Sequence, residues 1–136
     1  MGLIHLDAGV IIGFLDDLDA HHQTSHEALA DALRHGDHIA LASSALAESL
    51  VGPARRGESA VQAVRTFLDR LPISIIPLDI EIATTAAKLR AAHRALRLPD
   101  ALVIATAIEQ EDHLITTDRK WPTAKALKYK GIITRL

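Results

Sequence analysis

Apolar and polar positions along the chain follow two alternating patterns, one typical of buried strands and the other of helices. Short apolar runs predict strands at residues 3–6, 38–42, 73–78 and 114–117, with a weaker final strand at 131–134. Apolar residues at helical spacing predict helices at residues 10–15, 25–34, 43–51, 58–71, 79–98 and 100–111. Because a parallel strand needs a crossover segment before its neighbour, this alternation predicts an α/β fold of three layers, α/β/α, around a central parallel sheet of four to five strands.

Residues that cap or break helices set the expected ends of several of these segments. Gly52-Pro53 is expected to end the third helix, and Asp79 can cap the long alanine-rich helix that follows the third strand. Pro99 then restarts a helix, and residues 118–127 are expected to form a short helix or a turn.

Composition narrows the class of protein and the chemistry that it can support. With 49% hydrophobic and 24% charged residues, the 136 residues suit one globular domain spanning residues 1–136. The chain has no cysteine, which excludes disulfides and thiolate sites, so a bound metal must be held by oxygen or imidazole ligands. No apolar stretch approaches the roughly 20 residues that a membrane-spanning helix needs. The run 9–15 also lacks a preceding basic segment, so we expect a cytoplasmic protein with no membrane partner.

Four acidic residues lie where apolar runs begin or end. Asp7 follows the first predicted strand and Asp118 the fourth, and helices that begin at the same edge of the sheet carry Glu48 and Asp100. Because the carboxyl ends of parallel strands share one edge, where ligands bind, all four side chains can converge there. Carboxylates so close together repel one another, and a divalent cation would neutralise them at neutral pH. Oxygen ligands select hard ions, so the sequence predicts a site for Mg²⁺ or Mn²⁺, which suits phosphodiester cleavage.

Each of these acids also has a simpler structural explanation. Asp7 and Asp118 can be turn residues, and Asp100 can cap a helix. Glu48 has no capping role, but a structural ion pair would account for it about as well as a metal. It is the joint occurrence of the four acids at one predicted edge that favours the metal site.

Histidines and serines offer other chemistry, but with less support. His22 and His26 have the i, i+4 spacing of a metal site on a helix, with His21 beside them. That stretch has no partner at a strand end, and a solvated surface is the simpler explanation. Ser43 and Ser44 have no evident histidine base, so a serine nucleophile is poorly supported.

The segments that carry the four acids together resemble those of PIN-domain proteins, and of VapC-type toxins in particular. The resemblance covers nearly the whole chain and rests on segments 6–12 (LDAGVII), 47–48 (AE), 98–105 (LPDALVIA) and 115–120 (ITTDRK). It implies a compact α/β/α fold and a Mg²⁺- or Mn²⁺-dependent ribonuclease that acts on structured or translation-related RNA. It also implies the toxin of a type II toxin–antitoxin system, inhibited by a cognate VapB-like antitoxin whose tail occupies the active-site groove, and a toxin homodimer.

The same resemblance implies roles for individual residues. The catalytic acidic quartet would be formed by Asp7, Glu48, Asp100 and Asp118, of which the three aspartates would be the metal ligands. The residue after the first acid is often Ser or Thr in such toxins and is Ala8 here. A supporting hydroxyl must therefore come from elsewhere, and Thr116 is the expected source.

Basic residues are the candidates for contacts with RNA. The net charge is −2, from 15 Lys and Arg against 17 Asp and Glu, so the whole chain offers no general attraction to nucleic acid. Basic residues on helix surfaces are also common for solubility alone. The candidate contacts with the RNA backbone are Arg90, Arg94, Arg97, Arg119 and Lys120.

Two other classes of function stay open at this stage. A phospho-receiver module is also a small α/β protein with an acidic Mg²⁺ site, but it needs a pair of adjacent acids after its first strand, where Asp7 stands alone. It also needs an acceptor after its third strand, where Asp79 is better used as a helix cap. A PIN fold that binds metal or RNA without cutting would be a non-catalytic interaction module.

Overall fold

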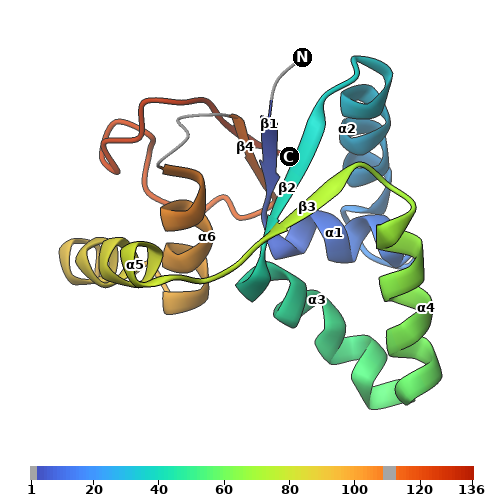
Figure 1. Ribbon diagram of the computed structural model, residues 1–136. Helices are drawn as coiled ribbons and strands as arrows, with labels where there is room; N and C mark the ends of the chain where they lie inside the picture. The colour runs from blue at the N-terminus through green and yellow to red at the C-terminus, as the bar shows by residue number, and fades with distance from the viewer. Residues whose placement is uncertain (1–2, 109–112) are drawn as a thin grey trace.

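The chain forms a five-stranded parallel sheet between two groups of helices (Figure 1). The structure is a computed structural model that describes residues 3–108 and 113–136. The strands are β1 (Leu3–Leu6), β2 (His38–Ala42), β3 (Ile73–Ile76), β4 (His113–Thr116) and β5 (Ile133–Arg135). Their order in the sheet is β3-β2-β1-β4-β5, and every neighbouring pair is parallel. The predicted central parallel sheet is confirmed.

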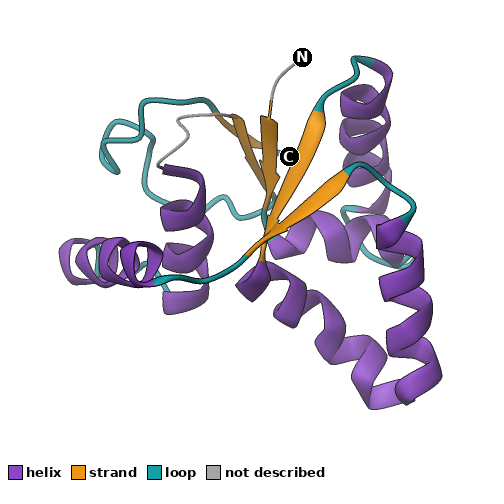
Figure 2. Cartoon of the chain, in the orientation of Figure 1, coloured by secondary structure: helices purple, strands orange, loops and turns teal. Residues whose placement is uncertain are grey.

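The helices cover both faces of this sheet. They are α1 (Ala8–Leu15), α2 (His22–Arg34), α3 (Ser43–Arg56), α4 (Glu58–Asp69), α5 (Ile80–Ala92) and α6 (Leu98–Ile108). In Figure 1, α1, α2 and α4 lie to the right of the sheet and α5 and α6 to the left, and Figure 2 shows the strands between the two groups. The chain moves outward from β1 to β3, then crosses back to β4. Because parallel crossovers are right-handed, that reversal puts α5 and α6 on the opposite face. The predicted three-layer α/β/α fold is confirmed.

The core lies where the strands meet these helices. Ile39 and Leu41 of β2 and Leu114 of β4 are fully buried, and Ile104 of α6 packs in the same cluster. A parallel sheet covered on both faces needs apolar side chains on both faces, which is why its strands are continuous apolar runs. Among the described residues, no helix is both long enough and apolar enough to cross a membrane.

The third helix continues through the residues that were expected to end it. α3 includes Gly52 and Pro53 and ends at Arg56, before Gly57, whose φ of +121° favours glycine. Pro53 cannot donate a hydrogen bond to the carbonyl of Ser49, but its side chain is buried. The prediction of an end at Gly52-Pro53 is wrong because packing of the buried proline ring outweighs the lost hydrogen bond.

The alanine-rich helix is shorter than predicted. α5 begins as expected, with the side chain of Asp79 accepting a 2.8 Å hydrogen bond from the N–H of Ile82. It ends at Ala92, and a loop at residues 93–97 carries the buried side chain of Leu96 into the core. The prediction of a helix as far as residue 98 is therefore wrong: alanine permits helix, but the chain turns after Ala92 and buries Leu96 from the loop.

The last predicted helix, α6, and the segment 118–127 complete the comparison with the predicted elements. α6 begins at Leu98, so Asp100 lies in its first turn. The predicted end of this helix near residue 111 lies outside the described residues. Residues 118–127 form turns, and the side chain of Trp121 is buried there.

Candidate functional site

Asp7 lies at the carboxyl edge of the sheet, directly after the central strand β1. It is the N-cap of α1, and its Oδ1 accepts a 2.8 Å hydrogen bond from the N–H of Ala8. Its Oδ2 accepts a second hydrogen bond, also 2.8 Å, from the hydroxyl of Thr116 at the end of β4. Only 6% of its surface is exposed. Both carboxylate oxygens are therefore fixed, and the next strand in the sheet supplies one of the donors.

Thr116 joins two of the acids at this edge. Its side chain is fully buried, and its hydroxyl donates to Asp7 and accepts a 3.0 Å hydrogen bond from the N–H of Asp118. The strand ends at Thr116, so Asp118 lies two residues past β4 rather than directly after it. The carboxylate of Asp118 accepts a 2.8 Å hydrogen bond from the N–H of Lys120, as in an Asx-turn. Thr116 thus supplies the hydroxyl that Ala8 lacks.

Asp100 reaches the same edge from the first turn of α6. It is 6% exposed, and its Oδ2 accepts a 3.2 Å hydrogen bond from Nε of Arg97, in the loop just before the helix. Asp100 and Asp118 together line a pocket of about 330 Å³ that also includes Arg97, Lys120 and Trp121. Two of the four acids therefore face one cavity, and two of the predicted basic residues lie beside them.

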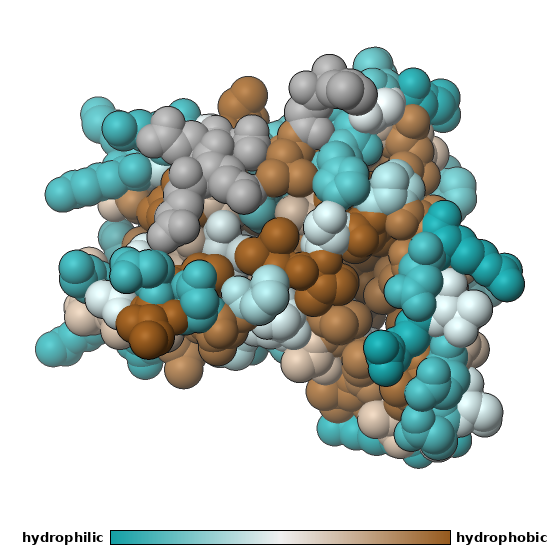
Figure 3. Space-filling view, viewed as in Figure 1, coloured by the Kyte–Doolittle hydropathy of each residue, from teal (hydrophilic) through white to brown (hydrophobic). Residues whose placement is uncertain are grey.

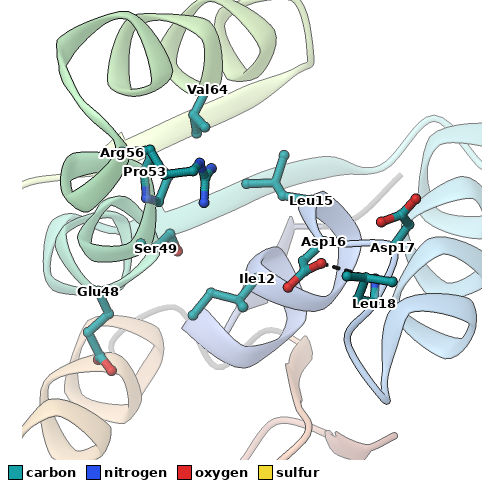
Figure 4. Close-up of a pocket in the computed structure, with 11 residues that line it drawn as sticks. Ile12, Leu15, Asp16, Asp17, Leu18, Glu48, Ser49, Pro53, Arg56 and Val64 are labelled. Atoms are coloured by element: carbon teal, nitrogen blue, oxygen red, sulfur yellow. Dashed lines mark hydrogen bonds between the residues drawn. The ribbon is translucent and has the colours of Figure 1, made fainter.

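Glu48 comes from α3, whose first residue directly follows β2. Its side chain is half-buried and lies at one end of a second pocket, of about 590 Å³, between α1, α3 and α4. Figure 4 shows its carboxylate pointing away from this pocket, and Asp16, Asp17 and Leu18 at the far end. Helix α3 also contacts α6, the helix that carries Asp100. The structure thus brings helices α3 and α6 together near the ends of β1 and β4.

The electrostatics show that three of the acids, Asp7, Glu48 and Asp100, lie within each other's field. Burial raises the pKa of Asp7 from 3.8 to about 6, although its hydrogen bonds from Thr116 and Ala8 act in the opposite direction. The negative charges of Asp100 and Glu48 raise this pKa further. Burial also raises the pKa of Glu48, followed by the charge of Asp100. Several ionised carboxylates close together at a sheet edge destabilise the folded protein unless a cation offsets their repulsion.

Arg97 is a cation of the described part of the chain that offsets these negative charges. Its pKa is raised, first by its hydrogen bond to Asp100 and the charge of that residue, and also by the charges of Glu48 and Asp118. The guanidinium therefore lies in the field of three of the four acids. The sequence placed Arg97 near the end of a longer predicted helix and identified it only as a candidate RNA contact.

The donor set suits a hard cation, but the side chains as they lie do not yet form a complete cage. Among the described residues, no three His, Asp or Glu side chains are close enough together to hold a metal ion. The oxygens of Asp7, Asp100 and Asp118 are nevertheless the ligand type that Mg²⁺ and Mn²⁺ prefer, and Mg²⁺ commonly binds through one or two carboxylates plus water. By the chemistry of their oxygen donors, the residues fit such an ion.

The other candidate residues lie further from this cavity or have other partners. Arg90 and Arg94 are exposed, and the guanidinium of Arg90 donates a 3.1 Å hydrogen bond to the carbonyl of Arg94. Arg119 is exposed beside Asp118. His22 bonds the carbonyl of Gly13 through Nδ1 at 2.8 Å. The histidine pair on α2 is thus engaged in packing between α1 and α2, where His26 also stacks on an aromatic ring.

The second pocket could not be foreseen from the sequence pattern, because it depends on the continuation of α3. Pro53 and Arg56 lie beyond the predicted end of that helix, and both line the pocket. Ile12, Leu15 and Val64 supply its apolar lining (Figure 4). The apolar stripe at 61–68 could have indicated part of the pocket lining. It could not have indicated that α3 and α4 would leave an opening toward α1.

Three solved structures with a similar fold are toxins or members of toxin–antitoxin systems. A toxin–antitoxin complex from Klebsiella pneumoniae is 26% identical, with a TM-score of 0.70 over 86% of this chain and 88% of that chain. VapC20 of Mycobacterium tuberculosis, a sarcin–ricin loop cleaving toxin, is 16% identical, with a TM-score of 0.72 over 86% and 91%. VapBC-5 from the same organism is 24% identical, with a TM-score of 0.61 over the whole of both chains.

Sequence comparison points the same way. An uncharacterized protein from Archaeoglobus fulgidus is 44% identical over 55 residues, which cover 40% of this chain and 77% of that protein. The model of the PIN domain family matches residues 4–127, from the first strand to beyond the fourth. Because that match spans far more than half of the sequence, this chain belongs to the PIN domain family.

Proposed function

We propose that this chain is the toxin of a type II toxin–antitoxin pair and cuts RNA as a Mg²⁺- or Mn²⁺-dependent endoribonuclease. The observation that carries the proposal is Asp7, a buried carboxylate with both oxygens held by hydrogen bonds and two further acids in its field. A protein has little reason to fix a charge so firmly at a sheet edge unless a ligand uses it. A divalent cation would offset the repulsion that raises the pKa of Asp7.

The four acids divide into two roles. Asp7, Asp100 and Asp118 would hold the ion, which when bound supplies a Lewis acid for the phosphate and for a water molecule. Glu48 would accept a proton from the attacking water, since its raised pKa brings it closer to neutral pH, where a general base works best. Thr116 would orient Asp7 and favour its charged form through the hydroxyl hydrogen bond.

RNA would approach the edge of the sheet where the basic residues lie. Arg97 and Lys120 line the same cavity as two of the acids, which is the place for contacts with the phosphates next to the cleaved bond. Arg119 is exposed next to them, and Arg90 and Arg94 extend the basic surface along α5 and its loop. Contacts to phosphate position the strand but do not read its sequence.

A VapB-like antitoxin would occupy the pocket that begins at Glu48. Its lining is apolar along Ile12, Leu15 and Val64, while Asp16 and Asp17 add negative charge at the far end (Figure 4). A peptide tail with apolar side chains and a cationic residue fits that lining better than RNA does, because RNA would meet repulsion from the acids. Such a tail would run directly into the catalytic edge and block it.

A second copy of the chain would cover the exposed apolar surface near β3. β3 is an edge strand of the sheet, and Ile75, Leu78 and Ile80 are exposed there by 39%, 50% and 81%. Figure 3 shows hydrophobic side chains at the surface in front of the sheet. Unprotected edge strands and apolar patches are unusual on a monomer. Sedimentation equilibrium of the purified protein would measure this homodimer directly.

The test of the proposed activity is cleavage of a mixed pool of cellular RNA by the purified, antitoxin-free protein. Reactions would contain Mg²⁺ or Mn²⁺, with EDTA as the metal-free control. Asp100→Asn and Asp7→Asn are expected to lose cleavage. Asp31→Asn is the matched control, because Asp31 is an exposed acid paired with Arg34 at the same i, i+3 spacing as the pair at the site. It should cut like the wild type.

The outcomes separate the site from the activity. Cleavage that needs the metal and both site acids supports the proposal in full. Cleavage that EDTA stops but Asp7→Asn does not would keep the nuclease and discard this site. A folded wild-type protein that cuts nothing with either metal would support the alternative of a non-catalytic PIN interaction module.

A further inference from the structure

Arg97 pairs with an acid that is far more buried than it is. The side chain of Arg97 is 69% exposed, whereas that of Asp100 is 8% exposed, and 3.2 Å separate Nε from Oδ2. A second ion pair, between Asp31 and Arg34, has both side chains mostly exposed, at 61% and 70%. The two pairs share the i, i+3 spacing, so spacing alone does not explain why one of them reaches into the acidic edge.

The guanidinium lies among the acids rather than beside one of them. The charges of Glu48 and Asp118 reach Arg97 as well as that of Asp100, and Asp118 lines the same cavity. Because the side chain of Arg97 is mostly in solvent, its charge is partly screened. Even so, the guanidinium lowers the negative potential that a second cation would experience.

We propose that Arg97 is a built-in counter-ion that competes with the divalent cation for Asp100 and so weakens metal binding. This inference rests on the proposed metal-dependent function. In the metal-free protein, the guanidinium occupies an oxygen of Asp100. When an ion binds, Arg97 leaves that oxygen and turns toward solvent, at the mouth of the cavity where a phosphate of the RNA would lie.

Two observations indicate that Arg97 can leave Asp100 at little cost. Its side chain is largely in water already, so leaving Asp100 exposes little apolar surface. It lies in the loop between α5 and α6, just outside helical structure, so its long stem can turn without disturbing a helix.

The exchange predicts opposite effects on binding and on cleavage. Removing the charge of Arg97 takes a positive charge away from the ion's site, so metal affinity should rise about three- to tenfold, the scale of a screened interaction at a partly buried site. Removing it also takes a cation away from the phosphate, so cleavage at saturating metal should fall. A residue that merely braced the loop would weaken both.

The experiment is titration of the full chain with Mn²⁺, with free Mn²⁺ followed by electron paramagnetic resonance. Trp121, the single tryptophan, lines the same cavity, so quenching of its fluorescence gives a second readout. Arg97→Gln is the test variant. Arg97→Lys keeps the charge, and Arg94→Gln removes an exposed arginine from the same loop. Arg97→Gln should bind Mn²⁺ more tightly than the wild type. Arg97→Lys and Arg94→Gln should bind Mn²⁺ with the affinity of the wild type.

The outcomes distinguish failure of the counter-ion role of Arg97 from failure of the proposed metal dependence. Equal or weaker Mn²⁺ binding by folded Arg97→Gln would overturn the counter-ion role while the wild-type titration still supports the metal site. Tighter binding by Arg94→Gln as well would also overturn it, because the effect would then come from general surface charge. If the folded wild type and all variants bind no Mn²⁺, both the counter-ion and the proposed metal dependence fail.

Discussion

The buried carboxylate of Asp7 should make the metal-free protein less stable at neutral pH than at mildly acidic pH. Below its ordinary pKa of 3.8 the carboxyl is protonated in both the folded and the unfolded chain. Because burial raises the pKa to about 6 in the folded state, the unfolded chain ionises first as pH rises, and stability is lost until the folded carboxyl also ionises near pH 6. Above pH 6 the loss is complete.

The size of this loss follows from the two pKa values. A rise from 3.8 to about 6 corresponds to about 3 kcal/mol of stability lost above pH 6. The substitution Asp7→Asn keeps the shape of the protonated acid and carries no charge at any pH. We therefore expect Asp7→Asn to be about 3 kcal/mol more stable than the wild type at pH 7.5, and only about 1 kcal/mol more stable at pH 4.5.

The assay is urea denaturation of both proteins at pH 4.5 and 7.5, in EDTA. Comparing the two proteins at each pH isolates Asp7 from other groups that titrate in both. Adding Mg²⁺ at pH 7.5 should stabilise the wild type more than the variant, because only the wild type keeps the charge. A stability difference that is the same at both pH values would refute the reasoning, since it would mean that the carboxyl of Asp7 has an ordinary pKa.

Three further predictions concern the neighbours of this carboxylate. Thr116→Val should destabilise the protein by about 1–3 kcal/mol, because the N–H of Asp118 loses its acceptor; the urea midpoint should drop less for Thr116→Ser, which keeps the hydroxyl and loses only a buried methyl group. Gly9→Ala should cost about 1–3 kcal/mol, because a Cβ there would collide with the hydroxyl of Thr117. Thr117→Ala should restore most of that loss in the double variant, and simple additivity in thermal denaturation would contradict the collision. Glu48→Gln should lose cleavage but keep Mn²⁺ binding in calorimetry; loss of binding would make Glu48 a metal ligand instead.

Much of the fold could be predicted because it depends on local pattern. The apolar runs marked all four main strands, and Asp79 caps its helix as expected because that cap needs only the next three residues. The missed helix ends depend on contacts far away in sequence. Pro53 stays within α3 because its ring is buried, and α5 ends early because Leu96 turns into the core. Neither burial is visible in local propensity.

The candidate site divides in the same way. The edge where Asp7 and Asp118 meet follows from strand direction, which the alternation of strand and helix already implies. The hydrogen bond from Thr116 to Asp7 follows once the two strands are neighbours, as β1 and β4 are. The hydrogen bond from Arg97 to Asp100 depends on the path of a loop. The pocket beside Glu48 depends on the length of α3, which the sequence pattern predicted too short. Loops and helix lengths are where sequence pattern carries the least information.

The hydrogen bond between Thr116 and Asp7 also orders events during the synthesis of the chain. Its two partners are 109 residues apart, so Asp7 leaves the ribosome long before Thr116 and Asp118 do. β1 cannot pair with β4 until β4 has been made, so a nascent chain carries an acidic edge that lacks its last aspartate and its supporting hydroxyl. A ribonuclease built in this way would be unable to cut the RNA of the ribosome that is making it until its fourth strand has emerged.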